Sequence, residues 1–178
     1  MYLQKINLKN KYALVTGAGK GLGRACSIAL AEAGATIIAL SRTQSDLDKL
    51  EKEIKKIKGK VIKVNCDVMN YEDLKEKLDK IKIIDILVNN AGITRDGVFR
   101  KMSADDWRAV MDTNLNSLFN VTKQVIEAMV DRGFGRIINI TSVSGQAGNA
   151  GQANYSSAKA GMIGLTKATA REVASRGI

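Results

Sequence analysis

Two residues near the end of the chain, Tyr155 and Lys159, have side chains that could carry out acid–base chemistry together. The chain contains no histidine, the side chain that most often moves protons near neutral pH. Phenols and ammonium groups each titrate at about pH 10 in isolation, but a nearby ammonium favours the ionised form of a phenol. Residues four apart share a face of any helix, so the spacing also fits an ordinary helix surface. Either the pair acts as a proton donor, or it is simply two neighbours on a helix surface. The rest of the sequence has to distinguish these alternatives.

The stretch TGAGKGLG, residues 16–23, follows an apolar run and precedes a segment of helical periodicity. Glycines allow a sharp turn and a close approach to a ligand, and the free N–H groups at the start of a helix offer a place for phosphate. The P-loop pattern fails because no Gly-Lys-Ser/Thr follows, and G-x-G-x-x-G fails because Leu22 takes the place of its third glycine. The stretch fits T-G-x-x-x-G-x-G and predicts dinucleotide binding, through Thr16, Gly17, Gly21 and Gly23.

The second apolar run ends in ALSRTQ, at a place where dinucleotide-binding folds select their cofactor. An acidic residue there binds the ribose 2′-hydroxyl of NAD, whereas an arginine accommodates the 2′-phosphate of NADP. The sequence has Ser41 and Arg42 at this place, and Lys20 in the glycine-rich turn could add a second positive charge. We therefore expect NADP(H), against the alternative that both cations are simply solvated.

Apolar runs of strand length alternate with segments of helical periodicity along the chain. Runs made almost wholly of Val, Ile and Leu are typical of a parallel sheet that is covered on both faces. We therefore expect one α/β domain over residues 1–178, a doubly wound parallel sheet of the Rossmann-like kind. The expected strands are YALVTG, TIIALS, KVIKVN, IDILVNN and GRIINITS, and the expected helices cover residues 22–33, 46–58, 71–81, 105–131 and 152–175.

Composition restricts the other classes of function. The formal charge of the 178-residue chain is +10, but most lysines alternate with acidic residues on expected helices, which favours a solvated surface over a nucleic-acid site. No run is long and apolar enough to span a membrane, and the N-terminus lacks the apolar segment of a signal peptide. Cys26 and Cys66, without any histidine, predict packing and no metal site. We expect a cytoplasmic protein with no metal, nucleic-acid or membrane partner.

The glycine pattern, together with CDV and NNAG further on, resembles the short-chain dehydrogenase/reductase family. In CDV, the resemblance implies that Asp67 binds the adenine amino group and that the amide of Val68 contacts the ring, although an Asp after a strand is also a common helix cap. In NNAG, residues 89–92, it implies backbone packed against the adenosine ribose. The implied cofactor-binding residues are Gly17, Lys20, Gly21, Leu22, Gly23, Arg42, Asp67, Val68, Asn89, Ala91, Gly92, Tyr155 and Lys159.

The family places a serine thirteen residues before its catalytic tyrosine, and counting back from Tyr155 reaches Ser142. An asparagine of the long preceding helix corresponds to Asn114. The resemblance implies that Tyr155 protonates a developing alkoxide and that Ser142 holds the carbonyl. It implies that Lys159 assists the tyrosine and holds the nicotinamide ribose. For Asn114 it implies a local break in the helix and a water that relays protons to Lys159.

From residue 89 onward the chain looks most like two groups of this family, the 3-oxoacyl-(acyl-carrier-protein) reductases and the acetoacetyl-CoA reductases. The resemblance implies NADPH-dependent reduction of a 3-oxoacyl thioester carried by acyl carrier protein, with coenzyme A as the second choice. Family members continue past the place of Ile178, so we expect a fold that lacks the last strands of the family. This leaves a second hypothesis open, a non-catalytic nucleotide-binding or interaction fragment of the same fold.

For the complete protein the resemblance implies a homotetramer. We expect helices 105–131 and 152–175 to lie at a subunit interface. Five apolar residues of these helices are compatible with such an interface, although packing in the core explains them equally well: Val121, Val125, Met129, Met162 and Leu165.

Overall fold

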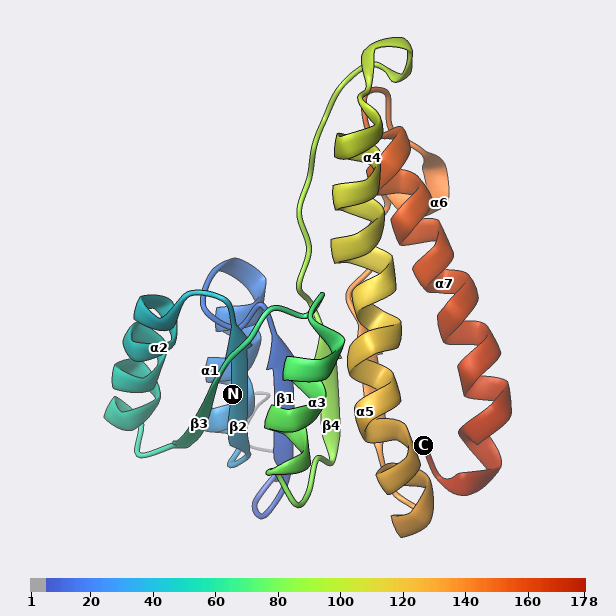
Figure 1. Cartoon of the computed structure of the whole chain (residues 1–178). Helices are drawn as coiled ribbons and strands as arrows, with labels where there is room; N and C mark the ends of the chain where they lie inside the picture. The colour runs from blue at the N-terminus through green and yellow to red at the C-terminus, as the bar shows by residue number, and fades with distance from the viewer. Residues whose placement is uncertain (1–5) are drawn as a thin grey trace.

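A five-stranded parallel sheet forms the centre of the protein (Figure 1). The computed structural model describes residues 6–178. The order across the sheet is β3-β2-β1-β4-β5, and every neighbouring pair is parallel, which confirms the doubly wound α/β sheet. All five expected strands are present, the last two shorter than their apolar runs: β1 (Tyr12–Thr16), β2 (Thr36–Ser41), β3 (Lys60–Asn65), β4 (Ile86–Asn89) and β5 (Arg136–Asn139).

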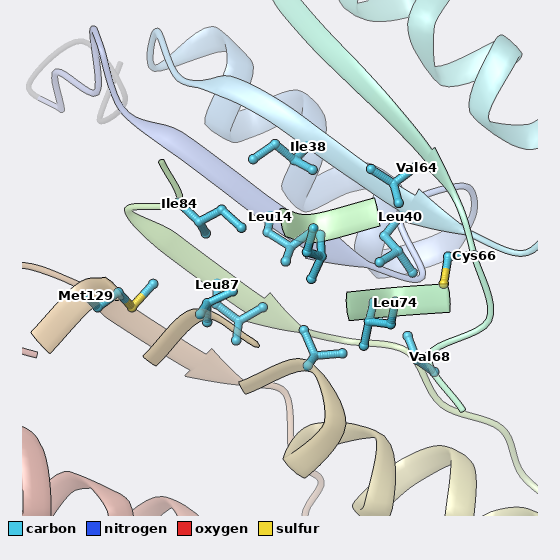
Figure 2. Close-up of a cluster of buried hydrophobic side chains, with 13 residues drawn as sticks. Leu14, Ile38, Leu40, Val64, Cys66, Val68, Leu74, Ile84, Leu87 and Met129 are labelled. Atoms are coloured by element: carbon cyan, nitrogen blue, oxygen red, sulfur yellow. The ribbon is translucent and has the colours of Figure 1, made fainter. Parts of the chain in front are cut away.

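Successive side chains of the strands enter two separate apolar cores, one on each face of the sheet. Leu14 on β1, Ile38 on β2 and Leu87 on β4 are buried on one face, and Figure 2 shows them together. Val15 and Ile37 are buried on the opposite face. Because both faces of β1, β2 and β4 are covered, nearly every position of these three strands is apolar, which explains their continuous Val, Ile and Leu runs. β3 and β5 are more exposed.

Helices cover the two faces in separate groups. The core that contains Val15 includes side chains from α1 and α2, and the core that contains Leu14 includes side chains from α3 and α5. None of the helices within residues 6–178 is long and apolar enough to cross a membrane. The α-helices are α1 (Gly21–Glu32), α2 (Gln44–Lys56), α3 (Tyr71–Asp79), α4 (Ala104–Met111), α5 (Ser117–Arg132), α6 (Ser144–Ala147) and α7 (Ala153–Val173).

The helix expected over residues 105–131 is interrupted. Between α4 and α5 lies a π-helical segment, η3 (Asp112–Asn116). The expected helix over residues 152–175 is α7 followed by a short 3₁₀ turn, η4 (Ala174–Arg176). Neither α6 nor the 3₁₀ turn η2 (Phe99–Lys101) was predicted, because segments this short carry no periodic signal.

Four of the five apolar residues expected at a subunit interface are core residues instead. Val121, Val125, Met129 and Met162 are each at most 2% exposed. The first three belong to the core cluster that includes Leu14 of the central strand. The prediction that these side chains are available to a partner subunit is therefore wrong, and the alternative of core packing is confirmed.

Candidate active site

The carboxyl ends of β1 and β4 form the crevice at which dinucleotides bind in sheets of this kind. From β1 the chain builds the sheet in one direction through β2 and β3, and it then returns to the other side for β4 and β5. The loops after β1 and β4 consequently leave the sheet toward opposite faces, which opens a space between them. The glycine-rich turn follows β1. The stretch NNAG, residues 89–92, begins with the last residue of β4 and continues into the loop after it.

The glycine-rich turn needs glycine for two physical reasons. Gly17 and Gly21 have φ of +63° and +51°, in the left-handed region that other residues rarely adopt. A Cβ on Gly23 would overlap the carbonyl oxygen of Gly17 and the side chain of Asn90. Leu22, in contrast, is 68% exposed on the first turn of α1 and could be replaced without steric conflict.

Thr16 and Asn90 fasten the glycine-rich turn to the end of β4. The Thr16 hydroxyl accepts hydrogen bonds from the backbone N–H groups of Asn90 and Ala91, both at 3.0 Å. The Asn90 side chain donates to the Thr16 carbonyl at 3.0 Å. Sequence reasoning assigned Asn90 no role of its own, although an amide directly after a buried strand was the available signal.

A cavity of about 250 Å³ opens beside this turn. Seven of the expected cofactor-binding residues line it, namely Gly17, Lys20, Arg42, Asp67, Val68, Ala91 and Gly92. Ser41, named beside Arg42 in the sequence analysis, also lines it. The sequence analysis assigned no place in this site to six others, namely Leu40, Thr43, Asp46, Cys66, Ile93 and Thr113. Burial raises the pKa of the Cys66 thiol to about 12, so this part of the lining stays uncharged at neutral pH.

Both cations of the cavity are paired with carboxylates that also line it. Lys20 Nζ lies 3.1 Å from Asp46 Oδ2, and Arg42 Nη1 lies 3.5 Å from Asp67 Oδ2. The Arg42–Asp67 pair is exposed on both sides, at 63% and 40%, and is therefore weak. Lys20 is 78% exposed, whereas the Asp46 side chain is 9% exposed, so only the cation of that pair faces solvent. Either cation can therefore turn toward an anionic ligand in the cavity.

Asp67 has a second contact that its place after β3 predicts. Its Oδ1 accepts a hydrogen bond from the backbone N–H of Met69 at 3.0 Å, which forms a local Asx-type turn. The helix-cap alternative is wrong, because the N-cap of α3 is Asn70, whose side chain accepts from the N–H of Asp73. The other oxygen faces Arg42. Asp67 thus shapes its own loop and also borders the cavity.

Asn89 lies inside the sheet and away from the cavity lining. It is 2% exposed, and its side-chain amide donates to Thr122 Oγ1 at 3.1 Å and to Asn139 Oδ1 at 2.9 Å. The structure therefore gives this side chain the task of joining β4 to α5 and β5. Within NNAG, Ala91 and Gly92 are the residues that reach the cavity.

Lys159 is a buried ammonium held by the backbone. It is 4% exposed, and its Nζ donates to the carbonyl oxygen of Ile140 at 2.6 Å. Nζ also lies 5.7 Å from the centre of the Tyr155 ring. Burial lowers the pKa of Lys159 from its ordinary value. The amine of Lys159 and the ring of Tyr155 thus lie side by side on α7, as expected for residues four apart on a helix.

Ser142 follows β5 in a segment that packs directly against the Lys159 turn of α7. The Thr141 hydroxyl donates to the carbonyl of Lys159 at 3.0 Å. Gly145 sits so close to this turn that a Cβ would lie 2.8 Å from the Cβ of Lys159. Ser142 Oγ itself accepts a hydrogen bond from the backbone N–H of Ser144 at 3.2 Å.

Asn114 lies at the centre of the π-helical segment η3, where the helix was expected to break. It is fully buried, and its side chain makes two hydrogen bonds with the backbone of Ile93, at 2.7 and 2.8 Å. Ile93 lines the cofactor cavity. A Cβ on Gly161, two residues past Lys159, would lie 2.9 Å from Leu115, so η3 also packs against α7.

A polar bridge that sequence reasoning missed joins α6, the start of α7 and the loop after β4. Ser144 Oγ donates to Gln152 Oε1 at 3.2 Å, and Gln152 Nε2 donates to Asp96 at 3.0 Å. Nearby in the chain, Val143 and Phe99 are 75% and 73% exposed. These residues border the catalytic segment on the outside.

The residues of this site fit a dinucleotide. The glycines let the backbone approach a pyrophosphate at the start of α1, the cavity beside them has polar and cationic walls, and Tyr155 with Lys159 lies on the side of β4 and β5. The fold and the site together define a dinucleotide-binding enzyme of the Rossmann-like class.

Comparison with known proteins identifies the family. The sequence profile described as short chain dehydrogenase matches residues 11–178. The chain is 47% identical over 176 residues to a 3-oxoacyl-[acyl-carrier-protein] reductase of Synechocystis sp., with 96% of this chain and 71% of that protein covered. It is 48% identical over 176 residues to an acetoacetyl-CoA reductase of Cupriavidus necator, with 96% of this chain and 72% of that protein covered.

A solved structure supports the same conclusion. A crystal structure of a proposed gluconate dehydrogenase from Agrobacterium tumefaciens superposes with a TM-score of 0.93 at 38% identity, over 97% of this chain and 70% of that one. The chain therefore belongs to the short chain dehydrogenase family and is an oxidoreductase. Membership implies a nicotinamide cofactor.

Proposed function

We propose that the protein uses NADPH to reduce a 3-oxoacyl thioester, on acyl carrier protein or coenzyme A, to the 3-hydroxyacyl thioester. The observation that carries the proposal is the buried Lys159 ammonium, held on the Ile140 carbonyl beside the Tyr155 ring. The two relatives described above, at nearly equal identity, support the 3-oxoacyl thioester as substrate class. Their equal similarity does not separate the two carriers.

Reduction of a ketone needs a hydride at carbon and a proton at oxygen. NADPH supplies the hydride when it is bound. Tyr155 gives its phenolic proton to the developing alkoxide, and Ser142 donates a hydrogen bond that holds the carbonyl oxygen in place. The Lys159 ammonium stabilises the negative charge that remains on the Tyr155 oxygen.

Asn114 has a positioning role in this proposal. Its side chain accepts from the N–H of Ile93 and donates to the carbonyl of Ile93, so it ties η3 to the loop after β4. η3 also packs against α7 through Leu115. Asn114 therefore helps to keep the loop after β4, which contains Ile93, at a fixed distance from α7, which carries Tyr155 and Lys159. We also propose that a water bound near η3, where π-helical hydrogen bonding replaces the α-helical pattern, resupplies protons to Lys159.

The preference for NADPH rests on Arg42 and Lys20. Both are exposed, both line the cavity beside the end of β2, and each is held only by a weak ion pair. A 2′-phosphate brings negative charge to this place, whereas the ribose hydroxyl of NADH brings none. The two cations therefore favour the phosphorylated cofactor.

We also propose that the complete protein forms a homotetramer through α5 and α7. The interface cannot use the buried residues Val121, Val125, Met129 and Met162. On α5, Phe119 is 58% exposed and is the large apolar side chain that supports an interface there. Light scattering that reports a monomer for the complete protein would refute this.

The reductase proposal is tested by following NADPH absorbance with acetoacetyl-CoA and with acetoacetyl carrier protein. We expect consumption of NADPH with at least one of these substrates and much slower consumption of NADH. Acetyl-CoA, which has the same carrier but no 3-ketone, is the matched control and should give no consumption. If the protein binds NADPH but reduces neither 3-ketone, the proposed substrate is wrong. Its membership of the oxidoreductase family would be unaffected.

A further inference from the structure

A large cavity lies on the sheet face that α3 covers, separate from the cofactor cavity. It is an open groove of about 880 Å³ between β3 and the connection from α3 to β4. Figure 1 shows β3 at the outer edge of the sheet. The groove shares no lining residue with the cofactor cavity, and we call it the lysine groove: Tyr12, Gln44, Ile62, Lys63, Val64, Asn65, Lys77, Lys80, Ile81, Lys82 and Ile83.

The floor and walls of the lysine groove are apolar. Val64 is 6% exposed and belongs to the core under α3, against which Tyr12 and Ile81 also pack. Ile62 and Ile83 are 39% and 42% exposed, although both are large aliphatic side chains. The groove is thus a place where the apolar core reaches the surface, and covering it would remove these side chains from water.

The rim of the lysine groove is cationic. Four of its lining residues are lysines and none is a carboxylate. Lys63, Lys77 and Lys80 are paired with carboxylates of α2 and α3 that lie outside the lining, at 2.6 to 2.8 Å, and the described residues supply no such partner to Lys82. The hydrogen bond with Asp48 raises the pKa of Lys63, and the one with Asp73 raises the pKa of Lys77, so both stay charged at neutral pH.

Size decides which class of partner fits. A volume of about 880 Å³ lies within the range of small-molecule sites, which hold roughly 300 to 1,000 Å³. A stable protein interface needs about 20 to 30 residues on each side. The groove is lined by eleven. A second copy of this chain or an acidic protein would therefore need a surface larger than this groove provides.

We propose that the lysine groove binds a fatty acid, with its aliphatic tail along Ile62, Val64 and Ile83 and its carboxylate at Lys82. An apolar floor favours burial of the tail. Lys82, to which the described residues supply no carboxylate partner, attracts the anionic head. The carboxylate can also compete for Lys80, whose exposed pair with Glu76 is weak. The proposal concerns binding alone and does not depend on the reductase activity.

The first experiment measures binding of laurate by isothermal titration calorimetry, below its micelle concentration. Dodecyltrimethylammonium has a tail of the same length with a cationic head, and butyrate has the same head with a short tail. We expect laurate to bind about tenfold or more tightly than either. Equal binding of dodecyltrimethylammonium would show a merely apolar surface and would overturn the proposal.

Variants locate the binding. Ile83→Asp places a negative charge on the apolar wall, and Lys82→Glu reverses the unpaired cation, and both side chains are exposed in the native protein. Each should weaken laurate binding about tenfold or more. Ile57→Asp and Lys52→Glu make the same changes at exposed positions outside the groove and should leave binding unchanged.

Three outcomes would overturn the proposal. If laurate still binds to the Ile83→Asp and Lys82→Glu variants, the fatty acid binds outside the lysine groove, for example near Tyr155 and Lys159. Sedimentation that shows self-association abolished by Ile83→Asp, without laurate binding, would assign the groove to a second copy of the chain. The absence of any laurate binding by a protein that still binds NADPH would reject the site while leaving the reductase proposal intact.

Discussion

Two lysines of the site, Lys20 and Lys159, lie in opposite surroundings. The Lys20 side chain is 78% exposed and pairs with the Asp46 carboxylate, whereas Lys159 is 4% exposed and donates to the carbonyl of Ile140. An exposed ion pair exchanges easily with a ligand. A buried ammonium held by the backbone stays at one place. In the proposed function, the cofactor region thus uses an exposed cation that can exchange partners, and the catalytic region uses a buried cation that is held at one place.

The partners of the two lysines differ in charge as well. Lys20 Nζ lies 3.1 Å from a carboxylate oxygen of Asp46, which offsets part of its charge. Within residues 6–178, no carboxylate lies within ion-pair distance of Lys159, so its charge acts undiminished on the nearby Tyr155 ring. A carbonyl can orient an ammonium without cancelling its charge, which is why this partner suits catalysis.

The largest expected effect tests the buried Lys159 and its neighbour Tyr155. Tyr155→Phe should lower kcat about a hundredfold or more, the scale of general acid catalysis, and should leave NADPH affinity nearly unchanged. Lys159→Met removes the charge at similar side-chain length and should lower kcat comparably. Because the two groups act as a unit, the double variant should lose little more than either single one. The measurements are kcat and NADPH fluorescence for all three proteins.

The control for this experiment is Tyr71→Phe, which removes the same hydroxyl at the start of α3, outside the site. It should retain normal turnover. Losses that add in the double variant would mean that Tyr155 and Lys159 act independently.

The next effect tests the exposed cations of the cofactor cavity, Arg42 and Lys20. Arg42→Asp replaces attraction for the 2′-phosphate by repulsion and should raise the Kd for NADPH about tenfold to a hundredfold, with little change for NADH. Lys52→Asp makes the same charge reversal on α2 away from the cavity and is the matched control. Equal weakening of both cofactors by Arg42→Asp would contradict a phosphate-binding role.

A smaller effect concerns the packing that keeps Lys159 stationary. Gly145→Ala would bring a Cβ within 2.8 Å of the Lys159 Cβ, so we expect a loss of about 1–3 kcal/mol in unfolding free energy together with reduced turnover. Gly164→Ala, on the same helix as Lys159 and with open space around it, should stabilise by about 0.5–1 kcal/mol. Chemical denaturation of both variants measures the difference, and equal stability would show that α6 can move away from α7.

The smallest effect concerns Asp46. Asp46→Asn removes the carboxylate that competes with the 2′-phosphate for Lys20, so NADPH should bind about two- to fivefold more tightly, in line with the modest strength of an exposed pair. Asp48→Asn removes a carboxylate of the same helix that faces Lys63 and should have no such effect. Weaker NADPH binding in a folded Asp46→Asn protein would mean that Asp46 positions Lys20 for the phosphate.

Sequence reasoning succeeded where a function depends on local geometry. The spacing of Tyr155 and Lys159 places them on one face of a helix wherever that helix lies. The glycines of residues 16–23 likewise predicted a tight turn between strand and helix, and Gly17 and Gly21 have the positive φ that such a turn uses. The apolar runs predicted all five strands, most clearly β1, β2 and β4, which are covered on both faces.

Sequence reasoning failed where a residue's role depends on what packs against it from far along the chain. Val121 and Met129 were compatible with an interface or with the core, because the sequence of a helix shows its apolar face but not the surface which that face meets; the structure buries both. Asp46 was overlooked because only the folded glycine-rich turn brings Lys20 to it, twenty-six residues away in the chain. The lysine groove is likewise formed by strands and a connection that meet only in the fold.

The sequence by itself determined the class of fold, the dinucleotide-binding turn and the tyrosine–lysine pair, because each depends on the period of a helix or strand or on the backbone freedom of glycine. Tertiary structure alone decided that Lys159 would be buried on the Ile140 carbonyl, that Asn114 would be tied to Ile93, and that Lys20 would stay exposed beside Asp46. The reason is that burial and electrostatic surroundings are properties of the space around a side chain. That space is made by residues whose distance along the chain has no relation to their distance in the fold.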